Sequence, residues 1–166
     1  MTFEAIFRAH LDFVWRVARR EVGDEGADDV AQETFLIVRR RLPEFSGAAV
    51  QGWLYRITVN VARNHRRRRH RQHRAVANAP VPSGPLGPDD VLARDEAVEL
   101  MERFVATLRP KQREAFVLHV LEGVPAREVA AALGIPTRTV YSRARAARAA
   151  LSSFVEATQT EPEAVG

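Results

Sequence analysis

Apolar residues recur every three or four positions along most of this chain, which is the spacing of amphipathic helices. The first stripe occupies positions 3, 6, 7, 11, 14, 17 and 18 and predicts a helix from Phe3 to Val22. Thr2 is suited to cap this helix, because its hydroxyl can accept a hydrogen bond from a free backbone N–H of the first turn. Gly23 and Gly26 are expected to break it.

Two further stripes complete a first group of helices. A helix from about Ala27 to Leu42 ends before Pro43 and turns one apolar side inward: Ala27, Val30, Ala31, Phe35, Val38 and Leu42. A third helix begins near Gly52 and continues into an Arg-rich run, with a packing stripe of Trp53, Leu54, Ile57 and Val61. We expect the three helices to form one module over residues 1–74.

The second half is set apart by composition. Residues 75–89 hold four of the nine prolines, two glycines and one serine, which is typical of an extended flexible linker. Helices are then predicted over residues 91–108 and 110–121, the second with Pro110 in its first turn. The expected fold is all-α, with two small helical modules, residues 1–74 and 90–155, and a polar tail at 156–166.

The second module contains the layout of a helix-turn-helix. Arg127 to Leu133 form a short helix, Gly134-Ile135-Pro136 form the turn, and Thr137 is placed as the N-cap of a helix that runs to about Phe154. Small Ala130 lets the two helices approach closely. The last helix buries Val140, Ala144, Ala147 and Leu151, and it turns outward Arg138, Tyr141, Ser142 and Arg145, with Arg143 and Arg148 at the flanks.

Such an outward face admits two interpretations. An ordinary helical hairpin could carry a solvated Arg face. A basic face of Arg, Tyr and Ser that opens at a capped helix start is, however, typical of a helix that reads the DNA major groove. The turn, the cap, the small residue and the basic face occur together, so we favour DNA binding.

Charge is segregated along the first module. Residues 1–35 carry 4 Arg and 8 acidic residues, whereas residues 36–74 carry 11 Arg and 1 acidic residue, in a chain of net charge +4. From Arg63 to Arg74 there are seven Arg and three His with no acidic residue. Guanidinium groups in such a run can neutralise phosphates and release counterions. A solvated basic helix end or a basic linker is the alternative, but the two signs of charge indicate a nucleic-acid partner and a protein partner.

Composition excludes several classes of site. Without cysteine, the chain can form neither a disulfide framework nor a thiolate metal site. His65, His70 and His73 lie among Arg side chains that would repel a metal cation. We find no nucleophile–base pair, no phosphate-cradling Gly loop and no paired catalytic acids, so we expect no catalytic residue, metal or cofactor and no enzyme. Charges interrupt the first apolar pattern, which indicates a soluble cytoplasmic protein without membrane insertion.

Taken together, the motifs resemble the extracytoplasmic-function (ECF) group of bacterial sigma factors, from about Phe3 to Leu151. The segments ADDVAQETF at 27–35 and WLYRITVNVARNHRRRR at 53–69 are similar to the second conserved region of that family. The segment LRPKQREAFVLHVLEGVPAREVAAALGIPTRTVYSRARAA at 108–147 is similar to its fourth region. The resemblance implies a subunit that binds core RNA polymerase, directs it to two promoter elements and is released after initiation. An anti-sigma factor is an expected further partner.

The resemblance also implies a role for the acidic helix, which would dock on the clamp coiled coil of the largest polymerase subunit. The residues at that interface would be Asp28, Asp29, Gln32 and Glu33. Phe35 would support them from the core. A solvated helix face is the alternative for these carboxylates.

By the same resemblance, the third helix would recognise and help to melt the minus-ten promoter element. Asn60 and Asn64 lie on one helical face, where an amide can meet base edges, although many relatives have Asp in place of Asn64. The loop from Phe45 to Gln51 would hold a flipped base. Trp53 either packs in the core or contacts a base. The residues expected to hold phosphates are Arg56, Arg63, Arg66 and Arg67.

The last helix would read the minus-thirty-five element. Arg138, Ser142 and Arg145 are the first candidates, Tyr141 and Arg143 follow, and Arg127 would touch backbone phosphate. Two other classes remain open. A free-standing helix-turn-helix regulator would bind duplex DNA without polymerase, as a dimer. A nucleic-acid-processing enzyme would need a metal or an acid–base site.

Overall fold

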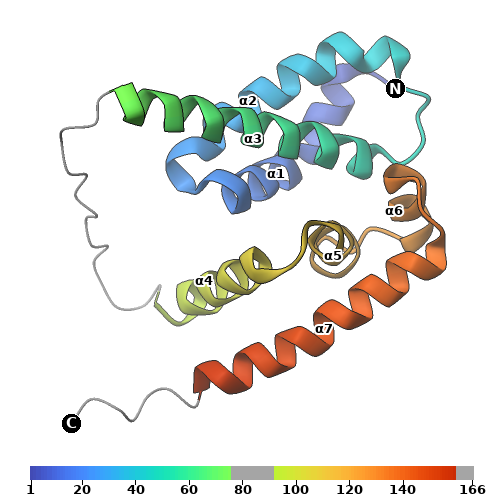
Figure 1. Ribbon diagram of the computed structural model, residues 1–166. Helices are drawn as coiled ribbons and strands as arrows, with labels where there is room; N and C mark the ends of the chain where they lie inside the picture. The colour runs from blue at the N-terminus through green and yellow to red at the C-terminus, as the bar shows by residue number, and fades with distance from the viewer. Residues whose placement is uncertain (76–91, 160–166) are drawn as a thin grey trace. The chain divides into compact units, whose positions relative to one another are not determined.

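The computed structural model describes residues 1–75 and 92–159, and these residues form helices and their connections (Figure 1). The chain divides into two compact units, Met1–Gly87 and Pro88–Gly166. The all-α prediction is confirmed. The predicted linker at 75–89 lies, apart from Ala75, outside the described residues.

The first unit contains α1 (Phe3–Val22), α2 (Asp24–Arg41) and α3 (Val50–Ala75). The N–H of Ala5 donates to the hydroxyl of Thr2, so the predicted cap is present. Gly23, with a φ of 77°, separates α1 from α2. The prediction that Gly26 also breaks the helix is wrong, because Gly26 is buried inside α2.

Gly26 has no room for a side chain where α1, α2 and α3 meet. A Cβ there would lie 2.9 Å from Cγ2 of Val22 and 3.2 Å from Nε2 of His65. The glycine therefore serves the close approach of helices and not the end of one. This contact with α3 fixes where the Arg-rich half of α3 begins.

The core of the first unit follows the predicted stripes, with corrections. α2 buries Ala27, Val30, Phe35 and Val38 as expected, and α3 buries Leu54, Ile57 and Val61 together with the unpredicted Tyr55. Leu42 leaves the core, because it begins a short 3₁₀ turn, η1 (Leu42–Glu44), and is only half-buried. On α1 the predicted stripe includes two residues that are exposed, Phe7 at 37% and Leu11 at 38%. It omits Phe13, which is buried.

The second unit contains α4 (Leu92–Thr107), α5 (Pro110–Ala115), η2 (Phe116–Leu121), α6 (Ala126–Leu133) and α7 (Thr137–Gln159). The predicted helix over 110–121 begins at Pro110 but widens into the π-helical turn η2. α7 continues to Gln159, so the end predicted near Phe154 was too early.

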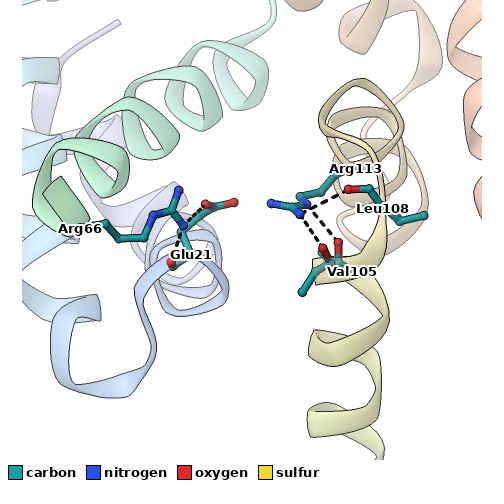
Figure 2. A network of polar contacts seen from close by, with 6 residues as sticks. Glu21, Arg66, Val105, Leu108 and Arg113 are labelled. Atoms are coloured by element: carbon teal, nitrogen blue, oxygen red, sulfur yellow. Dashed lines mark hydrogen bonds and ion pairs between the residues drawn. The ribbon is translucent and has the colours of Figure 1, made fainter. Parts of the chain in front are cut away.

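Aromatic packing and one arginine hold this unit together. The ring of Phe104 packs 5.5 Å from Phe116 and 5.5 Å from Phe154, which joins α4, η2 and α7. Arg113 donates to the carbonyls of Val105, Ala106 and Leu108 at 3.0, 2.9 and 3.3 Å (Figure 2). The carbonyls of Val105 and Ala106 belong to the last turn of α4, where backbone acceptors have no partner within the helix, and Leu108 follows the helix.

Candidate nucleic-acid interfaces

The helix-turn-helix of the second unit has the predicted layout. Gly134 ends α6 in the left-handed conformation, with a φ of 65° that glycine tolerates, and the N–H of Ile135 returns to the carbonyl of Ala130 at 3.0 Å. The prediction that Thr137 is the N-cap of α7 is wrong. Thr137 is the first helical residue, and the carbonyl of Pro136 accepts from the N–H groups of Thr139 and Val140.

The face of α7 divides as the spacing predicts. Val140, Ala144 and Ala147 are buried, and Leu151 is half-buried. Arg138, Tyr141, Ser142 and Arg145 are exposed, Arg143 is half-buried, and Arg127 of α6 is exposed. The exposed residues thus form one continuous face at the start of α7. A major groove is wide enough to admit an α-helix, so this face can reach base edges.

Arginines in the second half of α3 form ion pairs with a glutamate at the end of α1 and with two glutamates of α2. Nη1 of Arg66 donates to the carboxylate of Glu21 at 2.8 Å and to the carbonyl of the same residue at 2.7 Å (Figure 2). Arg68 contacts both carboxylate oxygens of Glu33 at 3.3 Å. The charges that are segregated in the sequence are therefore partly paired in the fold.

Arg69 adds a third such pair with Glu25, at 3.3 Å. Arg63 and Arg67 differ, since both are exposed and no carboxylate in the described part of the chain lies within ion-pair distance of them. Arg56 is also exposed. Phosphate binding is therefore best supported at Arg63 and Arg67, and less so at Arg66, which is already engaged.

Asn60 and Asn64 face the same groove, between α2 and α3. The groove has a volume of about 330 Å³, with an apolar floor of Ile37, Ile57 and Val61 and with Arg40 and Arg41 at its edge. An apolar floor can accept the face of a base, while amides and guanidinium groups can meet its edges and its phosphate. Sequence reasoning missed Arg40 and Arg41, although their position in the last turn of the second helix was a usable signal.

The connection before α3 holds a stacked aromatic pair. The rings of Phe45 and Trp53 lie 4.3 Å apart and 17° from parallel, and both residues are half-buried, as is Gln51. Trp53 is thus neither a fully buried core residue nor an isolated exposed ring. Leu54, which is fully buried, takes the core position beside it.

The acidic face of α2 is partly held by neighbours within the first unit. Asp28, Asp29 and Gln32 are exposed, and Glu33 is half-buried. Nε1 of Trp15 donates to Asp28 at 2.8 Å. Glu33 is paired with Arg68, whereas Asp29 and Gln32 are exposed and make no such side-chain contact with the residues that the structure describes.

Both halves of the chain are similar to known protein families. The Sigma-70 region 2 family matches residues 6–72, and the Sigma-70 region 4 family matches residues 99–151. The ECF RNA polymerase sigma-E factor of Escherichia coli K12 is 32% identical over 148 residues, which cover 82% of this chain and 78% of that protein. The chain belongs to the ECF sigma factors of the sigma-70 family.

Two other similarities extend the comparison. ECF RNA polymerase sigma factor SigE of Mycolicibacterium smegmatis is 30% identical over 164 residues, which span 96% of this sigma factor but only 64% of that relative. The sigma factor RpoE from Bartonella quintana, crystallised with the anti-sigma factor NepR, has a TM-score of 0.69 at 23% identity, with 93% of this chain and 96% of that chain covered. The second similarity supports the fold.

The sigma factor also carries an apolar surface formed by α1 and α2, and Phe7 of the predicted α1 stripe belongs to it. Phe7 and Leu36 are 37% and 55% exposed, and with Phe3 and Phe35 they line a groove of about 360 Å³ that also includes Gln32. The acidic face of α2 and this apolar surface therefore meet at Gln32.

Neither a metal cluster nor a membrane helix marks the described residues. No group of three metal-binding side chains occurs among them, although the side chain of His73 is outside this set. None of the helices that the structure describes is long and apolar enough to cross a membrane.

Proposed function

We propose that this sigma factor docks on core RNA polymerase through the acidic face of α2 and reads two promoter elements with α3 and α7. The observation that carries the proposal is the separation of exposed polar faces: an acidic one on α2 and basic ones on α3 and α7. An acidic surface repels DNA and suits a protein partner, whereas the basic faces attract phosphate.

Docking rests on Asp28, Asp29, Gln32 and Glu33. Asp29 and Gln32 are exposed, and the apolar groove that begins at Gln32 supplies adjacent surface that a partner helix can cover. Trp15 orients Asp28 by its hydrogen bond of 2.8 Å. An interface of this kind combines oriented carboxylates with a desolvated apolar centre.

Minus-ten recognition rests on the groove between α2 and α3 and on the basic edge of α3. Asn60 and Asn64 would meet base edges over the apolar floor, and Arg40, Arg41, Arg63 and Arg67 would hold the backbone. The Phe45–Trp53 stack offers a ring surface to an unpaired base. Strand opening is then driven by preferential binding of the unpaired strand.

Minus-thirty-five recognition rests on α7. Arg138, Ser142 and Arg145 would enter the major groove, with Tyr141 and Arg143 beside them, while Arg127 would contact backbone phosphate. The polymerase supplies the chemistry of nucleotide addition, so the sigma factor itself needs no catalytic residue. It would act in the cytoplasm, where polymerase and chromosome meet, and an anti-sigma factor would be a further partner.

The decisive experiment is co-elution with sigma-free core RNA polymerase in gel filtration. The parent chain should co-elute, and a variant with Asp29→Ala and Gln32→Ala should co-elute weakly. Asp12→Ala is the matched control, because Asp12 is an exposed carboxylate on α1 outside the proposed face. A folded parent that never co-elutes would refute docking and favour a free-standing DNA-binding regulator.

A second experiment measures binding of the assembled holoenzyme to the duplex that it selects from a randomised promoter library. Arg63→Ala and Arg145→Ala should each weaken binding. Arg103→Ala, an exposed position on α4, should not. Equal effects at all three positions would indicate non-specific attraction and would count against two reading faces.

A further inference from the structure

The π-helical turn η2 brings a histidine against the exposed face of α7. The ring of His119 lies 5.5 Å from the ring of Tyr141, with an angle of 79° between the two planes. This is an edge-to-face arrangement, in which the positive edge of one ring meets the negative face of the other. Neither residue is fully buried, so the contact lies at the surface.

A hydrogen bond to the backbone holds the imidazole of His119 in place. Its Nδ1 lies 2.9 Å from the carbonyl oxygen of Val124. A carbonyl oxygen only accepts hydrogen bonds, so Nδ1 carries the hydrogen and donates it. The backbone of Val124 is fixed in turn, because its N–H donates to the carbonyl of Leu118 at 2.9 Å.

The local backbone explains why this arrangement is possible. The N–H of Glu122 donates to the carbonyl of Val117 at 2.9 Å, five residues earlier, so the turn is wider than an α-helical one. Such turns are rare and occur often at functional sites. In this chain the wide turn, His119 and the connection that contains Val124 form one hydrogen-bonded unit, and His119 contacts Tyr141.

Tyr141 lies in the middle of the exposed face of α7. It is 57% exposed and stands beside Arg138, Ser142 and Arg145. An exposed tyrosine is free to turn about two side-chain torsions, and that freedom is lost when the ring binds a partner. The contact with the ring of His119 restricts the ring of Tyr141 before any partner binds.

We propose that His119 is a positioning residue for minus-thirty-five recognition, which holds the ring of Tyr141 in the orientation that meets duplex DNA. In that orientation the ring can pack on a thymine methyl group or a sugar, and the hydroxyl can reach a phosphate. The inference rests on the proposed function of α7. It adds a residue outside the helix-turn-helix whose effect on DNA passes through Tyr141.

The contact itself can be tested without DNA. The chain has only two tyrosines, and Tyr55 is buried in the other unit, so ring-labelled tyrosine gives an internal control in NMR spectra of the full chain. His119→Ala should move the Tyr141 ring signals toward those of a free tyrosine and leave the Tyr55 signals in place. His119→Phe should keep Tyr141 displaced. Unchanged Tyr141 signals in His119→Ala would overturn the inference.

The consequence for DNA is tested in the holoenzyme with its selected duplex. His119→Ala and Tyr141→Ala should each weaken binding about threefold, and the double variant should be no weaker than the more affected single variant. His119→Phe should restore part of the binding, because it keeps an aromatic ring beside Tyr141 but lacks the hydrogen bond from Nδ1 to the carbonyl of Val124. Losses that multiply in the double variant would overturn a role through Tyr141.

The proposed DNA-reading role of α7 and the positioning role of His119 can be refuted separately. If Arg145→Ala leaves duplex binding unchanged, the proposed function of α7 fails and the DNA role of His119 fails with it. If Arg145→Ala weakens binding while His119→Ala does not, the inference alone is overturned.

Discussion

Replacing Arg66 by Ala should weaken folding of the first unit more than it weakens DNA binding. Nη1 of Arg66 bonds both the carboxylate and the carbonyl of Glu21, at 2.8 and 2.7 Å. The Glu21 side chain is only 9% exposed, so the variant would leave a carboxylate with little access to water. The pair also joins the end of α1 to the Arg-rich half of α3.

The magnitude follows from the exposure of the two partners. Removing one partner of a buried pair costs about 3–5 kcal/mol, whereas exposed pairs contribute about 0–1 kcal/mol. The Arg66 side chain is 47% exposed, which places this pair between the two limits. We therefore expect a loss of about 2 kcal/mol, which lowers the urea midpoint by about 1–2 M.

Tryptophan fluorescence measures this loss in the correct unit. Both tryptophans of the chain, Trp15 and Trp53, belong to the first unit, so their signal follows its unfolding alone. Arg67→Ala is the matched control, because Arg67 is exposed and is not paired with a carboxylate among the described residues. Equal urea midpoints for Arg66→Ala and Arg67→Ala would refute the structural role of Arg66.

DNA binding should show the opposite order. Arg67→Ala should lower the slope of log affinity against log salt by about one phosphate contact, while Arg66→Ala leaves that slope close to the parent value. A larger change of slope in Arg66→Ala than in Arg67→Ala would show that the Glu21 contact is given up when DNA binds.

Three further predictions follow from single contacts. Arg113→Ala should destabilise the second unit by about 2 kcal/mol, because three carbonyls lose the guanidinium, although that of Val105 keeps the N–H of Leu108 as a donor, and hydrogen exchange at the end of α4 should report it; exchange equal to the parent would contradict this. Thr34→Val should stabilise the first unit by about 1 kcal/mol in urea unfolding, since the buried hydroxyl of Thr34 has no hydrogen-bond partner among the described residues; a lower midpoint would oppose the reasoning. Burial lowers the pKa of His10, so the native state disfavours its protonation, and stability should fall as pH drops below the ordinary histidine pKa. His10→Gln should show a smaller loss of urea midpoint between about pH 7.5 and about pH 5, and an equal loss would count against His10.

Local pattern was enough to place most helices. α1 has the predicted bounds, because its stripe, its Thr2 cap and Gly23 all lie within one short stretch of sequence. Gly26 shows where local reasoning fails. A glycine near a helix end is typical of a break, but this one is buried against Val22 and His65, and His65 lies far along the chain. The start of α2 was therefore predicted too late.

The sequence was enough to predict which residues of the candidate site are exposed, but not which side chains contact one another. Spacing along α7 correctly separated the buried positions from the exposed Arg138, Tyr141, Ser142 and Arg145. The contacts of His119 with Tyr141 and of Arg66 with Glu21 join residues on different helices. Helical periodicity says which face a residue occupies and gives no information about which helix that face meets.

The pairing changes what the Arg run can do. Of the four consecutive arginines at 66–69, three contact carboxylates of α1 and α2, so the field that the run presents to DNA is weaker than its sequence indicates. Arg63 and Arg67 are exposed, as are Arg40 and Arg41 at the groove, and none of these four shares in the three pairs.

One of these pairs joins the two proposed surfaces directly. Glu33 belongs to the proposed polymerase face, and Arg68 belongs to the Arg-rich run. The two side chains form an ion pair, with 3.3 Å between Nη1 of Arg68 and Oε2 of Glu33. A partner that bound Glu33 would compete with Arg68, and a phosphate that bound Arg68 would compete with Glu33. Because coupling free energies between two binding events are reciprocal, docking through the proposed polymerase face would strengthen DNA binding through this pair by the same factor as DNA binding would strengthen docking. The proposed acidic and basic faces of the first unit would then be parts of one equilibrium, because Glu33 and Arg68 are paired with each other in the free chain.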